Sequence, residues 1–313
     1  MRTPDPRLYI QEVSARDGFQ MEAKCLTTEQ KIAYIDRLSL AGLAKIEVTS
    51  FTSPKSIPTL ADAAAVVAGI TRTPGVIYTA LVPNLRGCER ALATNIDEIN
   101  LVMSASESHN LANLGMTCEQ SLAQLASVAE RARGAVAMSV SLSTAFGCPF
   151  EGPIAIARIL ELLARFADMG LSQVSLCDTT GMANPAQAEH VFIEAMRHWP
   201  STEFTAHFHN TRGMGLANAL ASVRVGILRF DASLGGLGGC PYAPGATGNV
   251  CTEDLVHMFE AMGYRTAVDL DRLLAVAADL PALVGHDIPG QVVKAGASTR
   301  RYPLATVTMP RRS

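Results

Sequence analysis

The chain has 313 residues, of which 48% are hydrophobic and 18% charged, and 26 Lys and Arg stand against 29 Asp and Glu, a net charge of −3. This charge balance gives no support to nucleic acid or an anionic membrane as the main partner. The hydrophobic content excludes disorder for the bulk of the chain, because its burial can offset the lost chain entropy. The length allows one large domain or two.

The compartment is inferred from apolar runs and cysteines. The longest apolar runs, such as 63–70, are far shorter than the roughly 20 residues that a membrane helix needs, so no span is expected. The chain starts directly with a strand-like segment and shows no apolar leader, so we expect no secretion signal and a cytoplasmic location. The seven cysteines form no C-x-x-C pair. They indicate reduced, mostly buried thiols in a reducing compartment.

Short β-branched segments alternate with longer segments of helical periodicity along the chain. The predicted strands are 8–13, 45–50, 77–82, 98–104, 137–142, 173–177, 204–209 and 229–233. The predicted helices are 28–41, 59–69, 85–93, 117–133, 153–169, 185–199, 213–225 and 252–262. Eight strand-helix units in about 260 residues match a (β/α)8 TIM barrel in count and size.

A doubly wound open sheet uses the same alternation of strands and helices. Its dinucleotide fingerprint G-x-G-x-x-G is missing after the first strand, where the chain reads Ser14-Ala-Arg-Asp-Gly18. The barrel is therefore favoured. One further helix at 270–284 predicts a short C-terminal helical extension, so we expect a TIM-barrel catalytic domain over residues 1–285 and a polar C-terminal tail over 286–313.

Polar residues gather where the predicted strands end, which is where barrel enzymes build their active sites. His207 and His209 are two residues apart on one strand, so their side chains point to the same face. Ring closure makes strands 7, 8 and 1 contiguous, which can bring Asp17 and Asn249 to the same point. Two nitrogens and two oxygens suit an octahedral divalent ion better than closed tetrahedral zinc, so Mg²⁺ or Mn²⁺ is expected.

Other polar residues at the same rim are candidates for catalysis or support. Arg16 offers a fixed positive fork for an oxyanion beside Asp17, although the two could equally form a surface ion pair. Glu47 and Asp178 could orient Arg16 or a histidine, or position the substrate. Cys240 stands in a glycine-rich stretch, where a thiol is either incidental or a proton donor or base on a mobile loop.

At these motifs the sequence resembles the 3-hydroxy-3-methylglutaryl-CoA (HMG-CoA) lyase family of metal-dependent barrel lyases, up to about residue 285. The match rests on Glu12-Val-x-x-Arg-Asp-Gly-x-Gln20, Glu47-x-Thr-Ser-Phe-x-Ser-Pro-Lys55, Gly147-Cys-Pro-x-Glu-Gly152, Asp178-Thr, His207-x-His209 and Gly236-Leu-Gly-Gly-Cys-Pro-Tyr-Ala-x-Gly-Ala-x-Gly-Asn249. The last string is long and ordered, and it is the most specific of the six. The resemblance implies a metal on Asp17, His207, His209 and Asn249, with Arg16 and Cys240 catalytic.

The family's chemistry is a retro-Claisen cleavage that yields acetyl-CoA and an oxo acid. The resemblance implies that Asp17 or His207 removes the substrate's hydroxyl proton, that Arg16 stabilises the thioester enolate and that Cys240 protonates it. The residues implied in positioning the acyl-CoA substrate are Gln20, Glu47, Ser50, Ser175 and Asp178. Together with a bound cation, Arg16 and Arg212 would make the barrel mouth positive, as an anionic CoA substrate needs.

Two departures from the family's pattern bear on which substrate the protein accepts more than on which type of reaction it catalyses. The chain has Asn210-Thr-Arg212-Gly213 where well-known members have Asp-Thr-Tyr-Gly, and Cys177 stands where they have glycine. Arg212 is therefore a candidate contact for anionic substrate groups. A lyase for citramalyl-CoA or another 3-hydroxyacyl-CoA stays open, because one methylene changes discrimination by only about 1–3 kcal/mol.

Two readings from other classes also stay open. A related barrel synthase would run the condensation in reverse, although such enzymes usually carry a further C-terminal domain. A catalytically silent CoA-binding barrel would be expected to show a broken metal set, and all four candidate ligands are present here. The composition is also compatible with a homodimer.

Overall fold

A computed structural model describes residues 7–239 and 248–301. Eight parallel strands form a closed barrel in chain order, and β8 pairs with β1 to complete the ring. The strands are β1 (Tyr9–Glu12), β2 (Lys45–Ser50), β3 (Ile77–Leu81), β4 (Glu98–Ser104), β5 (Ala137–Ser143), β6 (Gln173–Asp178), β7 (Glu203–Phe208) and β8 (Arg229–Ala232). The predicted TIM barrel is confirmed, and every predicted strand agrees with the observed one to within a residue at each end.

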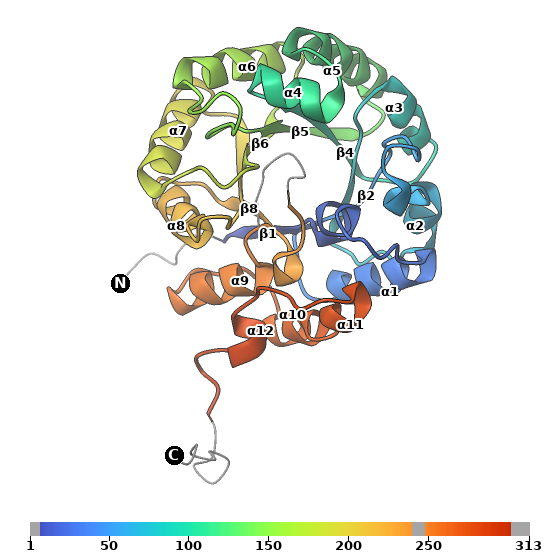
Figure 1. Ribbon diagram of the computed structural model, residues 1–313, viewed down its shortest axis with the longest axis vertical. Coiled ribbons are helices and arrows are strands. Elements are labelled where there is room, and N and C mark those ends of the chain that lie inside the picture. The colour runs from blue at the N-terminus through green and yellow to red at the C-terminus, as the bar shows by residue number, and fades with distance from the viewer. Residues whose placement is uncertain (1–6, 240–247, 302–313) are drawn as a thin grey trace.

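Helices surround the strands on the outside, and the last helices of the chain pack beside α1 (Figure 1). The helices are α1 (Thr28–Ser39), α2 (Ala63–Gly69), α3 (Leu85–Leu92), α4 (Glu107–Leu114), α5 (Cys118–Ala132), α6 (Ile156–Asp168), α7 (Pro185–His198), α8 (Gly215–Arg224), α9 (Thr252–Ala261), α10 (Leu270–Ala277), α11 (Leu280–Val284) and α12 (Val292–Ala295). Capping boxes at Thr27 and Thr117 begin α1 and α5 by satisfying backbone amides that have no partner inside the helix. Within the described ranges, no helix combines the length and the apolar character that crossing a bilayer requires.

Several helices differ from their predicted extents. Helix α4 was not expected, although Ser106 caps its start and Gly115 ends it in the left-handed conformation. The helix expected at 59–69 is a 3-10 turn, η2 (Pro58–Leu60), followed by α2. The helix expected at 270–284 divides into α10 and α11, with Pro281 in the first turn of α11, where its missing N–H costs nothing.

Part of the segment expected as a polar tail is folded against the barrel. Ile288 is buried, and the carboxylate of Asp254 on α9 accepts hydrogen bonds from the backbone amides of Gln291 and Val292. Helix α12 follows directly. The chain after residue 285 therefore begins with a packed extension and not with a solvated tail.

The barrel has an apolar outer layer and a polar interior. On β4, Ile99 and Leu101 are fully buried in the hydrophobic core, whereas Glu98 and Asn100 alternate with them and line an internal pocket. Most inward positions of β5 and β6 carry serine or cysteine. Such short polar side chains leave space inside the barrel, where bulky aliphatic residues usually fill it.

Candidate active site

Three of the predicted metal ligands converge at the carboxyl-terminal end of the barrel. Asp17, His207 and His209 each offer a ligand atom, and these atoms all lie within 4.8 Å of one another. Asp17 stands on η1 (Ser14–Gly18), a π-helical turn that follows β1, while His207 lies on β7 and His209 directly after it. The two imidazole rings are 5.4 Å apart. Strand β8 pairs with both β7 and β1, so closure of the ring brings distant parts of the sequence to one point.

Asn249 joins this cluster through hydrogen bonds. Its Nδ2 donates to Asp17 Oδ2 at 2.8 Å and to the Leu237 carbonyl at 3.0 Å, and its backbone bridges to His209. Its buried Oδ1 has no hydrogen-bond partner among the described residues. The amide nitrogen is engaged and the oxygen is available, which is the arrangement that a ligand of a hard cation requires. The four residues therefore fit a divalent ion.

Gly238 lies close above this pair. A Cβ at Gly238 would stand 2.8 Å from Asn249 Nδ2 and 3.0 Å from Asp17 Oδ2, and the residue has φ +91°. Only glycine allows the backbone to approach the ligands this closely in that conformation.

Sequence reasoning missed the partner of His207. Asp231 on β8 is the register partner of His207 across the parallel strands, and its Oδ2 lies 3.2 Å from His207 Nδ1. This contact holds the ring and leaves Nε2 to bind a metal. Burial opposes the charged imidazole, but Asp231 outweighs it, so the pKa of His207 is raised. An acidic residue inside the predicted strand 229–233, the neighbour of the strand that carries His207, was the signal that could have found it.

Arg16 is held between two carboxylates. Its Nε donates to Glu47 Oε2 and its Nη1 to Asp17 Oδ1, both at 2.5 Å. Glu47 on β2 is almost fully buried, and its other oxygen accepts from Asn100 Nδ2 at 3.0 Å. Burial disfavours the guanidinium charge, but Glu47 and Asp17 more than compensate and raise the pKa of Arg16. Arg16 is thus charged and fixed in direction.

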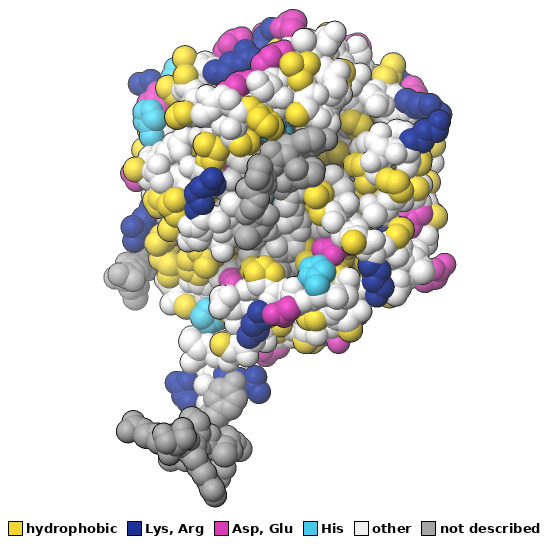
Figure 2. Space-filling model, in the orientation of Figure 1, with side chains coloured by type: hydrophobic (Ala, Val, Ile, Leu, Met, Phe, Trp, Pro, Cys, Tyr) yellow, Lys and Arg dark blue, Asp and Glu magenta, His cyan; other side chains and the backbone are white. Residues whose placement is uncertain are grey.

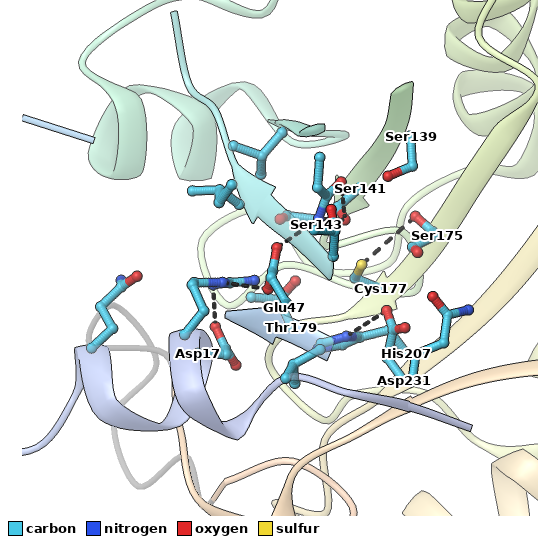
Figure 3. Close-up of a pocket in the computed structure, with 18 of the residues that line it drawn as sticks. Asp17, Glu47, Ser139, Ser141, Ser143, Ser175, Cys177, Thr179, His207 and Asp231 are labelled. Carbon is cyan, nitrogen blue, oxygen red and sulfur yellow. Dashed lines mark hydrogen bonds and ion pairs between the residues drawn. The ribbon is translucent and has the colours of Figure 1, made fainter. Parts of the chain in front are cut away.

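A pocket of about 180 Å³ extends from this cluster into the barrel. Figure 3 shows Glu47, His207 and Asp231 around a common space, which Ser141 on β5 and Ser175 on β6 also line. The predicted site residues that line the pocket are Arg16, Asp17, Gln20, Glu47, Ser175, His207 and His209. Gln20 Oε1 is buried and has no partner among the described residues, so it is free to bind a substrate donor.

The positive mouth expected from Arg16, Arg212 and a bound cation stays a prediction, because it depends on that ion. Two basic side chains line the pocket, Arg16 and Lys45, against five carboxyl side chains, those of Glu12, Asp17, Glu47, Glu98 and Asp231. Without a cation the pocket is therefore acidic. Lys45 pairs with Glu98 at the starts of their strands. Asp17 and Asp231 are therefore the carboxyl groups that contribute negative charge beside the two histidines, where a divalent ion would be stabilised.

Three predicted substrate contacts lie outside the pocket lining. The Ser50 hydroxyl pairs with Thr52 Oγ1 at 2.7 Å. Asp178 Oδ1 accepts from the amides of Met182 and Ala183, and burial raises its pKa to about 6. Arg212 is exposed and donates to the carbonyls of Thr180 and Gly181. Each of the three shapes a loop at the rim.

Cys240 lies outside the described residues, but Gly239, the residue before it, lines the pocket. On the face shown in Figure 2, most charged side chains lie toward the edge of the view. The described cysteines are free, and all except Cys25 are buried, as the sequence predicted.

Residues 7–280 match the HMGL-like family. The chain is 45% identical over 286 residues to hydroxymethylglutaryl-CoA lyase YngG of Bacillus subtilis (strain 168), covering 91% of this chain and 96% of the relative. It is 39% identical over 298 residues to (R)-citramalyl-CoA lyase of Chloroflexus aurantiacus, covering 92% and 94%.

One solved structure is similar to this chain over nearly the whole length of both proteins. An HMG-CoA lyase from Acinetobacter baumannii, in complex with coenzyme A and 3-methylmalate, has a TM-score of 0.94 and 48% identity, and the match covers 97% of this chain and 100% of that one.

Proposed function

The chain belongs to the HMGL-like family, and from that premise we propose that it is a metal-dependent carbon–carbon lyase acting on an acyl-CoA. The proposed substrate is HMG-CoA or a close analogue, cleaved in a retro-Claisen reaction to acetyl-CoA and an oxo acid, which is acetoacetate for HMG-CoA. The observation that carries the proposal is the convergence of Asp17, His207 and His209 beside Arg16 in one pocket.

The proposed cofactor is Mg²⁺ or Mn²⁺, held by Asp17, His207, His209 and Asn249. When bound, such an ion would lower the pKa of the substrate's tertiary hydroxyl and fix its orientation. Asp231 supports this role by orienting His207 through Nδ1. Asn249 Oδ1, which has no hydrogen-bond partner within residues 7–239 and 248–301, supports the fourth ligand.

The protein's own residues would handle the proton and the developing charge. Asp17 or His207, both in the pocket, would take the hydroxyl proton, and the electrons of the breaking carbon–carbon bond would pass into the thioester enolate. Arg16 would stabilise the enolate oxygen with the charge that Glu47 and Asp17 hold in place. Cys240 is proposed as the thiol that protonates the enolate carbon and completes acetyl-CoA.

The predicted substrate-binding residues fall into two groups, those that line the pocket and those that lie in the rim loops. Gln20 and Ser175 line the pocket and are proposed as substrate contacts, whereas Glu47 contacts Arg16 and is proposed to position it. Ser50, Asp178 and Arg212 hydrogen-bond within the rim loops, so their proposed effect on substrate binding is indirect. The division into a catalytic barrel over 1–285 and a C-terminal segment over 286–313 belongs to the same proposal.

A second substrate is supported by one of the similar proteins. That relative is a citramalyl-CoA lyase. Cleavage of citramalyl-CoA would give acetyl-CoA and pyruvate. The pocket of about 180 Å³ and its hydroxyl-bearing wall are compatible with either acyl group.

A product-resolved assay with HMG-CoA and citramalyl-CoA tests the proposal. We expect acetoacetate from HMG-CoA in the presence of Mg²⁺ or Mn²⁺ and no product with a chelator. Pyruvate without acetoacetate would move the assignment to citramalyl-CoA. No turnover of either thioester would favour a silent CoA-binding barrel.

Compartment and assembly complete the proposal. The free, mostly buried cysteines support the cytoplasm as the compartment. The low net charge and apolar composition are compatible with a homodimer, which sedimentation equilibrium would test.

A further inference from the structure

We propose that Asn100 is a positioning residue that directs Arg16 through Glu47, an inference that rests on the proposed lyase function. Asn100 lies in the middle of β4, half-buried, and it lines the pocket. Its neighbours Ile99 and Leu101 are fully buried on the helix side of the strand, so alternation turns the Asn100 side chain into the barrel. No predicted site residue lies on this strand.

The amide of Asn100 is fixed in orientation by two partners. Its Nδ2 donates to Glu47 Oε1 and to Ser141 Oγ, each at 3.0 Å, and Ser141 Oγ donates to its Oδ1 at 3.1 Å. Because an ionised carboxylate only accepts hydrogen bonds, the nitrogen of the amide must face Glu47. Both polar ends of Asn100 are thus engaged by protein groups, and its effect on substrate passes through Glu47.

Glu47 transmits this constraint to Arg16. Its side chain is 3% exposed, with one oxygen on Asn100 and the other on Arg16 Nε at 2.5 Å. A carboxylate anchored at both oxygens cannot rotate, so the guanidinium it holds keeps one direction. Charge stabilisation of an oxyanion depends on such a preset direction, because a misplaced donor must reorganise during the reaction.

The kinetic test compares Asn100→Leu with the wild type. Leucine keeps the approximate volume and removes the donor to Glu47. We expect kcat to fall about ten- to thirtyfold, the effect typical of losing a hydrogen bond to a charged group, while KM and the affinity for Mn²⁺ change less than about twofold. Ser141→Ala is the milder variant. It removes the hydrogen bonds of Ser141 to the Asn100 side-chain amide and leaves the contact of Asn100 with Glu47 in place, so kcat should fall about two- to fivefold.

The control and the coupling test separate positioning from general structural damage. Ser222→Ala on the outer helix α8 removes a buried hydroxyl that donates to the Asn218 carbonyl, outside the pocket, and should leave kcat unchanged. In a Glu47→Gln background, Asn100→Leu should lower kcat little further, because the path to Arg16 is already broken. Full additivity of the two substitutions would overturn the proposal.

A measurement independent of activity separates this inference from the proposed function. In protein labelled with ¹⁵N-arginine, the Arg16 Nε–H resonance is assigned by its loss in Arg16→Lys. We expect this resonance to shift in Asn100→Leu and Ser141→Ala and not in Ser222→Ala. An unchanged resonance in folded Asn100→Leu refutes the positioning role, even if wild-type protein cleaves no thioester. A shifted resonance in protein without lyase activity upholds the contact chain and refutes only the function.

Discussion

Asp231 illustrates how one residue outside the ligand set can control the metal. It contacts His207 Nδ1 at 3.2 Å from the neighbouring strand and so fixes the ring. We expect Asp231→Asn to weaken Mn²⁺ binding about 10- to 100-fold, because the amide orients the imidazole less strongly and lowers its basicity. Titration calorimetry with Mn²⁺ measures the affinity. Asp36→Asn, on the outer helix α1, is the control, and equal affinity in both variants would remove Asp231 from the metal site.

The proposed role of Cys240 depends on the acidity of its thiol. If its thiol protonates the enolate carbon, Cys240→Ser replaces an acidic proton donor by a far weaker one of similar size. We expect kcat to fall at least about 100-fold with KM within about threefold of the wild type. Steady-state assays of both parameters check this, with Cys25→Ser, at an exposed position, as the control. Equal kcat in the two variants would exclude the thiol from the reaction.

At the level of secondary-structure elements, the buried carboxylate of Glu12 ties three segments together. It accepts from the backbone amides of Ser14 and Leu234 and from Thr252 Oγ1, joining the end of β1 to η3 (Leu234–Gly236) and α9. Glu12→Ala leaves these buried donors without a partner, so we expect a loss of about 3–5 kcal/mol in the free energy of unfolding. Urea denaturation measures it.

The matched control for Glu12 is an exposed glutamate in an ion pair. Glu203 at the start of β7 pairs with Arg229 and is 48% exposed. Glu203→Ala should cost less than about 1 kcal/mol, because water solvates the partners that remain. A similar loss in the two variants would mean that Glu12 contributes only surface electrostatics.

The elements also show what the sequence could and could not predict. Periodicity located all eight strands, and strand order brought Asp17 and His207 together, because ring closure is a property of the whole topology. The division of the helix at 270–284 and the helix α4 depend on local caps that periodicity does not detect. The contact of His207 with Asp231 depends on the register of β7 against β8. The contact of Glu47 with Asn100 spans β3, so it depends on how the side chains fill the interior of the barrel.

Over the whole molecule, stability should depend on pH through Glu253. Burial raises the pKa of this carboxyl to about 8 in the folded protein, against 4.5 for an exposed one. Between these values the unfolded state has lost the proton and the folded state keeps it, so stability is full below about pH 4.5 and falls as the pH rises toward 8. We expect Glu253→Gln to flatten this dependence and to be more stable than wild type at pH 8, by a few kcal/mol at order of magnitude.

Thermal unfolding of both proteins from pH 5 to 9 checks this expectation. Glu253 Oε2 accepts the Gly235 amide, and glutamine keeps an oxygen for that bond. Glu130→Gln, at an exposed position of α5, is the control and should follow the wild type. A parallel pH profile for Glu253→Gln would show that another group sets the dependence.

Metal binding should also stabilise the whole fold, because the predicted ligands come from both ends of the chain. An ion that binds only the folded state stabilises it by mass action, about 2.7 kcal/mol at a concentration 100 times its Kd. For Mn²⁺ we expect Tm to rise by roughly 5 °C at that concentration. In His209→Ala the rise should largely vanish at the same concentration, while His190→Ala on the outer helix α7 should keep it. An equal rise in His209→Ala would place the ion elsewhere, since a site that joins η1 to β7 cannot hold it as tightly after losing a ligand.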